Sequence, residues 1–221
     1  MKDQLFEDLI SKQITKQQLY KEAQQQNIPI TTLLKGTKHP KAVVRYSCSK
    51  ALQDLSATKP HLLYNQYYFF FDLLKSEYRI LTWNALFIIS NLTTIDTKKY
   101  FDKHFELYFS YLQDDYLITV ANTIKTTSTI IESKPYLCEK IIELLLKNKQ
   151  RKTTEHLTEE CKKILAAETI KVFTAHYQIA TKQQQKKIRE FIDFYKNTQR
   201  KNLQKEIKKF EKKHSQNAEE H

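Results

Sequence analysis

Four alanine-centred strings of similar pattern recur along the chain and constrain its fold more than any other feature. They are VRYSCSKALQDL, YRILTWNALFII, YLITVANTIKTT and KKILAAETIKVF, and their alanines, Ala51, Ala85, Ala121 and Ala167, lie 34, 36 and 46 residues apart. Each string follows an apolar helical stretch and a short polar turn. A unit of two helices cannot bury its apolar face alone, so several such units must stack. The spacing predicts an all-α chain of stacked helix pairs, with Ala51, Ala85 and Ala121 buried where helices approach closely.

Further helices are expected at both ends of this array. Leu5, Phe6, Leu9 and Ile10 begin a group of small helices that closes one end, and an amphipathic helix containing Phe191 covers the other. Thr97 and Thr181 are candidate N-caps. The expected helix pairs between these ends are 61–75 with 77–92, 98–112 with 115–131, and 136–148 with 158–175.

The turn-and-helix pattern resembles the HEAT repeat of the HEAT and armadillo superfamily over roughly residues 30–175. The first unit matches closely and the second keeps most positions, whereas the third and fourth match loosely. This resemblance implies an α-α superhelix, a HEAT-like solenoid of about four helix pairs with terminal capping helices, in one domain over residues 1–198. The matching residues of the first two units are Leu33, Leu34, Pro40, Val44, Arg45, Ala51, Leu52 and Leu55, then Leu73, Leu74, Arg79, Ala85, Leu86 and Ile89.

The chain has a single glycine, Gly36. Phosphate-binding loops, dinucleotide-binding turns and the nucleophile elbow each need several glycines close together. We therefore expect a protein without a cofactor and favour a non-catalytic role. The alternative is a nucleic-acid-binding protein that resembles the HEAT-like DNA alkylation-repair glycosylases. These enzymes carry an Asp, a Trp and an Arg around the damaged nucleotide, and Asp72, Trp83 and Arg79 are a trio of those types.

Cysteine usage and the N-terminus favour a cytoplasmic protein. Cys48, Cys138 and Cys161 form no C-x-x-C pair, which argues against a zinc ribbon and a disulfide framework. His156 and Glu160 have a spacing that could serve a metal, but at a charged helix start we expect none. Acidic residues interrupt any signal peptide, and the longest apolar runs have five residues against the roughly 20 that a membrane span needs.

Positive charge is concentrated in the final third of the chain. Residues 1–146 carry 18 Lys and Arg against 15 Asp and Glu, whereas residues 147–213 carry 19 against 8. Such a basic surface is a candidate footprint for phosphates, nucleic acid or an acidic protein, although lysine excess also occurs on ordinary solvated surfaces. The candidate anion- or partner-binding residues are Lys147, Lys149, Arg151, Lys152, Lys162, Lys163, Lys186, Lys187, Arg189, Arg200 and Lys201.

Residues 199–221 are expected to form a separate basic segment. Leu203, Ile207 and Phe210 recur at intervals of four and three among lysines, which predicts a basic amphipathic helix followed by a disordered tail. This helix could dock on the solenoid, bind a partner groove or lie on an anionic membrane surface.

Together these features favour a non-catalytic helical-repeat scaffold or adaptor that binds another macromolecule through its basic C-terminal third. A protein partner is favoured, and nucleic acid is possible. The sequence leaves the partner's identity and the oligomeric state open.

Overall fold

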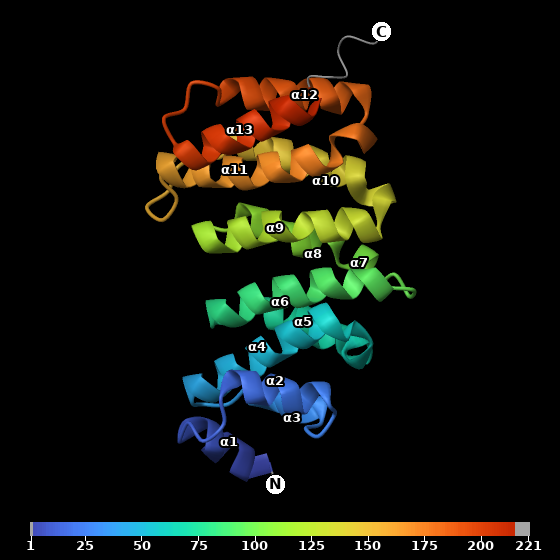
Figure 1. Cartoon of the computed structure of the whole chain (residues 1–221), viewed down its shortest axis with the longest axis vertical. Helices are drawn as coiled ribbons and strands as arrows, with labels where there is room; N and C mark the ends of the chain where they lie inside the picture. Colours follow the sequence, from blue (N-terminus) through green and yellow to red (C-terminus); the bar gives the residue numbers. More distant parts are fainter. Residues whose placement is uncertain (1, 215–221) are drawn as a thin grey trace. The chain divides into compact units, whose positions relative to one another are not determined.

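The computed structural model describes residues 2–214, and over that range it contains thirteen α-helices and no strand beyond one isolated bridge between Thr154 and Leu157 (Figure 1). The all-α prediction is confirmed. The helices are α1 (Lys2–Ile10), α2 (Lys16–Gln24), α3 (Ile30–Gly36), α4 (Ala42–Thr58), α5 (Tyr67–Leu74), α6 (Arg79–Leu92), α7 (Tyr100–Lys103), α8 (Phe105–Ser110), α9 (Leu117–Ser133), α10 (Cys138–Leu146), α11 (Glu159–His176), α12 (Lys182–Phe194) and α13 (Lys201–His214).

The chain divides into two compact units, Met1–Phe105 and Glu106–His221, which we call the N-terminal and C-terminal units. In the N-terminal unit α4 packs against α2, α3 and α6, and α5 packs against α6. In the C-terminal unit α11 packs between α9 and α13, and α10 packs against α12 (Figure 1). The expected single domain over residues 1–198 stays a prediction.

The repeated alanines lie inside these helix contacts. Ala51, Ala85 and Ala121 are 1 %, 0 % and 6 % exposed, which confirms their predicted burial. The single glycine lies at another close approach, between α3 and α4. A Cβ on Gly36 would overlap the Cys48 sulfur, so a larger residue does not fit there. Burial raises the pKa of the Cys48 thiol to about 12, so this cysteine is an inert core residue.

The repeat period is visible in hydrogen bonds between α4 and α6. The side-chain amide of Asn84 donates to the Ser49 hydroxyl at 2.7 Å, and that of Asn91 donates to the Ser56 hydroxyl at 2.9 Å. Both pairs are 35 residues apart in sequence. Because the two asparagines are separated by about two helical turns, the same contact recurs along one face of each helix.

The first helices of the predicted pairs are shorter than expected. Residues 61–75 yield α5 only from Tyr67 onward, since two 3-10 turns follow Pro60. Residues 98–112 form α7 and α8 with a break at His104. The Nδ1 atom of the His104 ring lies 2.9 Å from the Tyr100 carbonyl oxygen, which would accept the backbone N–H of His104 in an unbroken α-helix. The backbone N–H of His104 donates to the Phe101 carbonyl oxygen instead.

Of the two predicted caps, only one is correct. Thr181 begins α12 with a reciprocal capping box to Gln184. Thr97 caps no helix, because the carboxylate of Asp96 accepts the first backbone N–H groups of α7, from Tyr100 at 2.9 Å and Phe101 at 3.0 Å.

The predicted C-terminal amphipathic helix is α13, and it docks on α11. Leu203, Ile207 and Phe210 are at most 4 % exposed, and the Phe210 ring meets Tyr177 edge-on at 5.1 Å. The Arg189 guanidinium donates to the His214 carbonyl oxygen at 3.2 Å. The predicted disordered tail, residues 215–221, lies outside the described residues.

Candidate functional site

The segment 147–152, between α10 and α11, lies at the centre of three adjoining hollows in the C-terminal unit. Their volumes are about 360, 270 and 390 Å³. Lys149 lines the first and the second, whereas Lys147 and Gln150 line the second and the third. We call these three hollows the basic groove. Seven predicted binding residues line it: Lys147, Lys149, Arg151, Lys152, Lys162, Lys163 and Lys187.

The first hollow combines lysines with an exposed aromatic ring. Phe194, at the end of α12, is 61 % exposed, and the Lys149 ammonium lies 4.4 Å from its ring centroid. Lys162 and Lys163 enter from the first turns of α11, and the α12–α13 turn adds amide and hydroxyl groups. This hollow can therefore offer both positive charge and an apolar surface to one ligand.

The α11 lysines are partly neutralised by neighbouring acids. Lys162 pairs with Glu159 at 2.9 Å, and Lys163 pairs with Glu160 at 2.5 Å. Arg200 also pairs with Glu160, at 3.0 Å. Hydrogen bonds from Lys163 and Arg200 hold the pKa of the Glu160 carboxyl below its ordinary value. An anionic ligand would compete with these acids for the two α11 lysines.

Arg151 holds the segment in place rather than projecting from it. Its guanidinium donates to the carbonyl oxygens of Leu112 and Asp114. Burial lowers the pKa of the guanidinium, and the charges of Asp115 and Asp114 oppose that effect. The side chain thereby ties the groove's central segment to the turn before α9.

Three lysines of the groove are available to a ligand. Over the described range, Lys147, Lys149 and Lys152 have no carboxylate partner. By contrast, Lys187 pairs with both carboxylate oxygens of Glu143, at 3.0 and 3.1 Å. The unpaired positive charge of the groove therefore lies on the segment 147–152.

The remaining four predicted residues lie outside the groove. Lys186 is exposed on α12, and Arg200 bonds to Glu160. Arg189 donates to the Tyr177 hydroxyl at 2.8 Å and so stabilises the α13 docking. Lys201 lies on the solvent face of α13, in a separate lysine-lined hollow.

Phe194, which lines the groove, and Asn148, in the segment 147–152, were not predicted from the sequence. Phe194 lies off the apolar face of α12 that contains Phe191, and its position on the polar face was the signal that could have found it. Asn148 is 8 % exposed, yet neither atom of its amide has a hydrogen-bond partner. No local pattern marks such an orphaned amide, because its burial depends on the fold.

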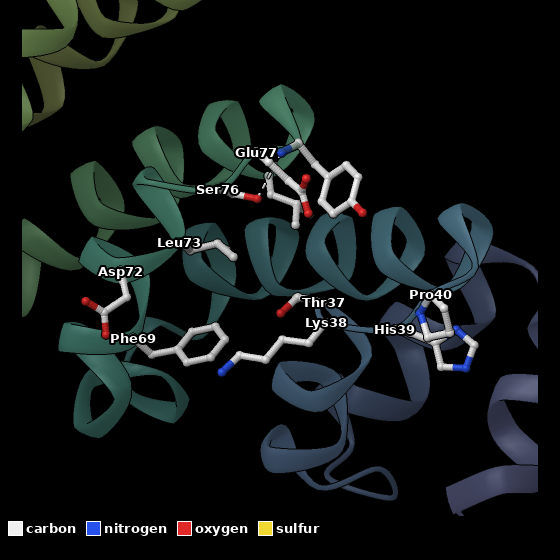
Figure 2. A pocket seen from close by; sticks show the side chains of 11 residues that line it. Thr37, Lys38, His39, Pro40, Phe69, Asp72, Leu73, Ser76 and Glu77 are labelled. Carbon is white, nitrogen blue, oxygen red and sulfur yellow. Dashed lines mark hydrogen bonds between the residues drawn. The ribbon is translucent and has the colours of Figure 1, made fainter.

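The residues considered for other chemistry do not form a common site in the described chain. Asp72 lines a pocket of the N-terminal unit that neither Arg79 nor Trp83 lines (Figure 2), and Trp83 is half-buried. Between residues 2 and 214, no three His, Cys, Asp or Glu side chains lie close enough to hold a metal ion. In the same range, each helix is too short or too polar to cross a membrane.

Two designed armadillo repeat proteins resemble this chain in structure. One, YIII(Dq)4CqI, is 16 % identical with a TM-score of 0.52. The other, YIII(Dq.V1)4CPAF, solved in complex with the peptide (KR)4, is 12 % identical with a TM-score of 0.53. Each match covers 83 % of this chain and 81 % of the designed one. No protein-family model and no curated protein matches the sequence. At such identities the likeness shows the fold alone, which is an all-α superhelix of stacked helices like that of armadillo repeat proteins.

Proposed function

We propose that this protein is a non-catalytic scaffold or adaptor that binds an acidic segment of a protein partner along the basic groove. The observation that carries the proposal is the position of Lys147, Lys149 and Lys152, which have no carboxylate partner in the described chain and line adjoining hollows. Lys149 lies beside the exposed ring of Phe194. Unpaired cations around an exposed apolar anchor fit a ligand that carries both negative charge and apolar side chains.

The mixed charge of the groove favours a peptide over a uniform polyanion. Asp115, Glu143, Glu159 and Glu190 line the same hollows as the lysines. A nucleic-acid backbone, with a charge on every phosphate, would meet repulsion from these carboxylates. A peptide can place its acidic residues at the lysines and neutral residues elsewhere, while the groove's amide side chains donate to and accept from its main chain.

The orphaned amide of Asn148 supports a role for this segment in binding. Leaving a buried polar group without a hydrogen bond costs about 1–3 kcal/mol. Asn148 has two such atoms and lies between Lys147 and Lys149. A rearrangement of the segment on binding that provided partners for this amide would recover part of that cost, and would thereby favour the bound state.

The fold supports a peptide ligand only in general terms. One designed armadillo protein was solved with a bound peptide, (KR)4, which is basic. The charge of the groove calls for the opposite chemistry in the partner. The proposal includes a cytoplasmic location, where the free thiols of Cys48, Cys138 and Cys161 would remain reduced.

The test is fluorescence anisotropy with a labelled peptide of four Glu-Glu-Phe repeats at about 50 mM salt, where surface charge is weakly screened. The variant reverses the three unpaired lysines: Lys147→Glu, Lys149→Glu and Lys152→Glu. An exposed ion pair contributes about 0.2–1 kcal/mol, so losing three weakens binding by roughly 3- to 150-fold. Far-UV circular dichroism should stay unchanged, since none of the three side chains is buried.

A matched variant makes the same charge change in the same unit: Lys201→Glu, Lys205→Glu and Lys208→Glu on the solvent face of α13. This variant should retain most of the affinity. An equal loss in both triple variants would reveal a diffuse effect of positive charge, and the groove would then not be the binding site.

The second candidate is a single-stranded nucleic acid, and one observation favours it. An exposed ring beside lysines, as at Phe194 and Lys149, is also how proteins stack an unpaired base next to its phosphate. An oligothymidine competitor separates the two. If it binds and the acidic peptide does not, and if each reversed lysine lowers the salt slope by about 0.7, the ligand is a nucleic acid.

A further inference from the structure

A second basic surface lies on the solvent side of α13, outside the basic groove. Four lysines recur there at intervals of four, three and four residues: Lys201, Lys205, Lys208 and Lys212. At 3.6 residues per turn these positions fall within an arc of about 60° around the helix axis, and the helical rise spreads them over about 17 Å. All four are exposed and line one open hollow. We call them the lysine stripe.

The lysine stripe lies opposite the face by which α13 docks on α11. That face occupies a second arc of about 60° on the far side of the helix. Its members are at most 4 % exposed: Leu203, Ile207, Phe210 and His214. The His214 ring Nε2 also lies 3.1 Å from the Thr174 carbonyl oxygen of α11. Because docking fixes the rotation of α13 about its own axis, the four lysines point away from the unit together.

The positive charge of the stripe is not neutralised by the described chain. Among residues 2–214, none of its four ammonium groups forms an ion pair or a hydrogen bond. The two acids of α13 lie elsewhere on the helix. The Glu206 side chain is 6 % exposed and pairs with Lys209, and Glu211 lies about a quarter turn from the stripe. By contrast, three lysines of α11 pair with glutamates of their own helix.

The chemistry of the stripe fits a flat and fluid anionic surface. Its hollow is lined by α13 alone and contains no aromatic ring, so it cannot enclose a side chain or stack a base. Lysine presents a point charge on a flexible stem, whereas arginine fixes a bidentate geometry. Lipid headgroups can move sideways to meet such charges, and lysine clusters on a helix attract anionic lipids.

The straightness of the stripe favours a membrane over a nucleic-acid duplex. A straight row of about 17 Å can bring all four ammonium groups onto one plane at the same time. The phosphates of a duplex follow curved strands, so the same row would meet only some of them. A lipid surface therefore uses more of the charge that the helix presents.

We infer that the lysine stripe holds the protein on a membrane surface rich in anionic lipid headgroups, with α13 parallel to that surface and still docked on α11. The contact is electrostatic, because the apolar residues of α13 are buried in the unit and do not enter the acyl region. Salt therefore reverses the binding. The inference goes beyond the proposed function, since the stripe lies outside the basic groove and its ligand is a lipid surface.

The experiment is co-sedimentation of the full chain with vesicles of phosphatidylcholine and phosphatidylserine, mixed at about 7:3, in about 0.1 M salt. The stripe variant carries Lys201→Gln, Lys205→Gln, Lys208→Gln and Lys212→Gln. It should bind about 100- to 1000-fold more weakly, because each lysine near an anionic surface strengthens binding about fivefold. The natural chain should bind no vesicles of phosphatidylcholine alone. It should leave the mixed vesicles at about 1 M salt, where the Debye length is about 3 Å.

Two further variants make the result specific. One removes four exposed lysines of the N-terminal unit and should keep most of the binding: Lys16→Gln, Lys21→Gln, Lys35→Gln and Lys41→Gln. The other keeps the charge of the stripe and should bind like the natural chain: Lys201→Arg, Lys205→Arg, Lys208→Arg and Lys212→Arg. Far-UV circular dichroism should be the same for all variants, since every substituted side chain is exposed.

Four results would overturn the inference. Equal losses in the two glutamine variants would show a diffuse effect of positive charge, and binding to phosphatidylcholine alone would show that charge is not needed. Binding that persists at about 1 M salt would mean that α13 leaves α11 and inserts its apolar face. Tighter binding of a DNA duplex than of the vesicles, lost in the stripe variant, would assign the stripe to nucleic acid.

Discussion

Replacing Phe210 with alanine tests whether α13 is an integral part of the C-terminal unit. Phe210 is 2 % exposed, and its ring packs against two others. The distance between ring centroids is 5.1 Å to Tyr177 and 4.8 Å to His214. Truncating a buried Phe to Ala costs about 3–5 kcal/mol, because apolar contacts are lost and a cavity remains. At about 2–4 °C per kcal/mol for a chain of this size, the unfolding midpoint should fall by about 6–20 °C. Circular dichroism at 222 nm during thermal unfolding measures this shift.

A second phenylalanine of the same unit provides the matched control. Phe194 is 61 % exposed, and its described contacts include the Lys149 ammonium and the edge of Tyr195. Phe194→Ala should lower the free energy of unfolding by no more than about 1 kcal/mol. If both substitutions cost the same, or if Phe210→Ala costs less than about 1 kcal/mol, α13 does not depend on its apolar face for docking and the argument from burial is wrong.

Three further predictions concern pH, packing and the orphaned amide. Burial lowers the pKa of His176 and of His214 below the ordinary 6.5, so the folded state binds fewer protons than the unfolded chain. The free energy of unfolding should therefore fall as the pH drops below about 6.5. Urea titrations measure this change, and a pH-independent profile would contradict the prediction. Ala85→Leu should overpack the α4–α6 contact and cost about 1–3 kcal/mol, measured by urea unfolding; an unchanged midpoint would argue against the repeat register. Asn148→Ala should be neutral or stabilising by up to about 1 kcal/mol in the same assay, since it removes two buried atoms without partners, and a clear destabilisation would mean that the amide is bonded.

The position of the basic site was only partly predictable from the sequence. Counting charges located the positive region after residue 146, and seven of the eleven candidate residues line the groove. The counts could not separate Arg151, which bonds to two backbone carbonyl oxygens, from Lys149, which has no carboxylate partner in the described chain. Charge is a property of each residue, whereas pairing depends on which groups the fold brings within hydrogen-bond distance.

The sequence by itself determined the helical class, the stacking of helix pairs and the burial of Ala51 and Ala85, because apolar periodicity and small residues at a fixed interval are local properties of the chain. Only the tertiary structure decided that Phe194 would meet Lys149 and that Lys38 would extend over Phe69. In both pairs the partners are more than 30 residues apart. Such contacts depend on how neighbouring helices pack and where each turn ends. No periodicity within either segment encodes which side chains of the other segment lie close in space.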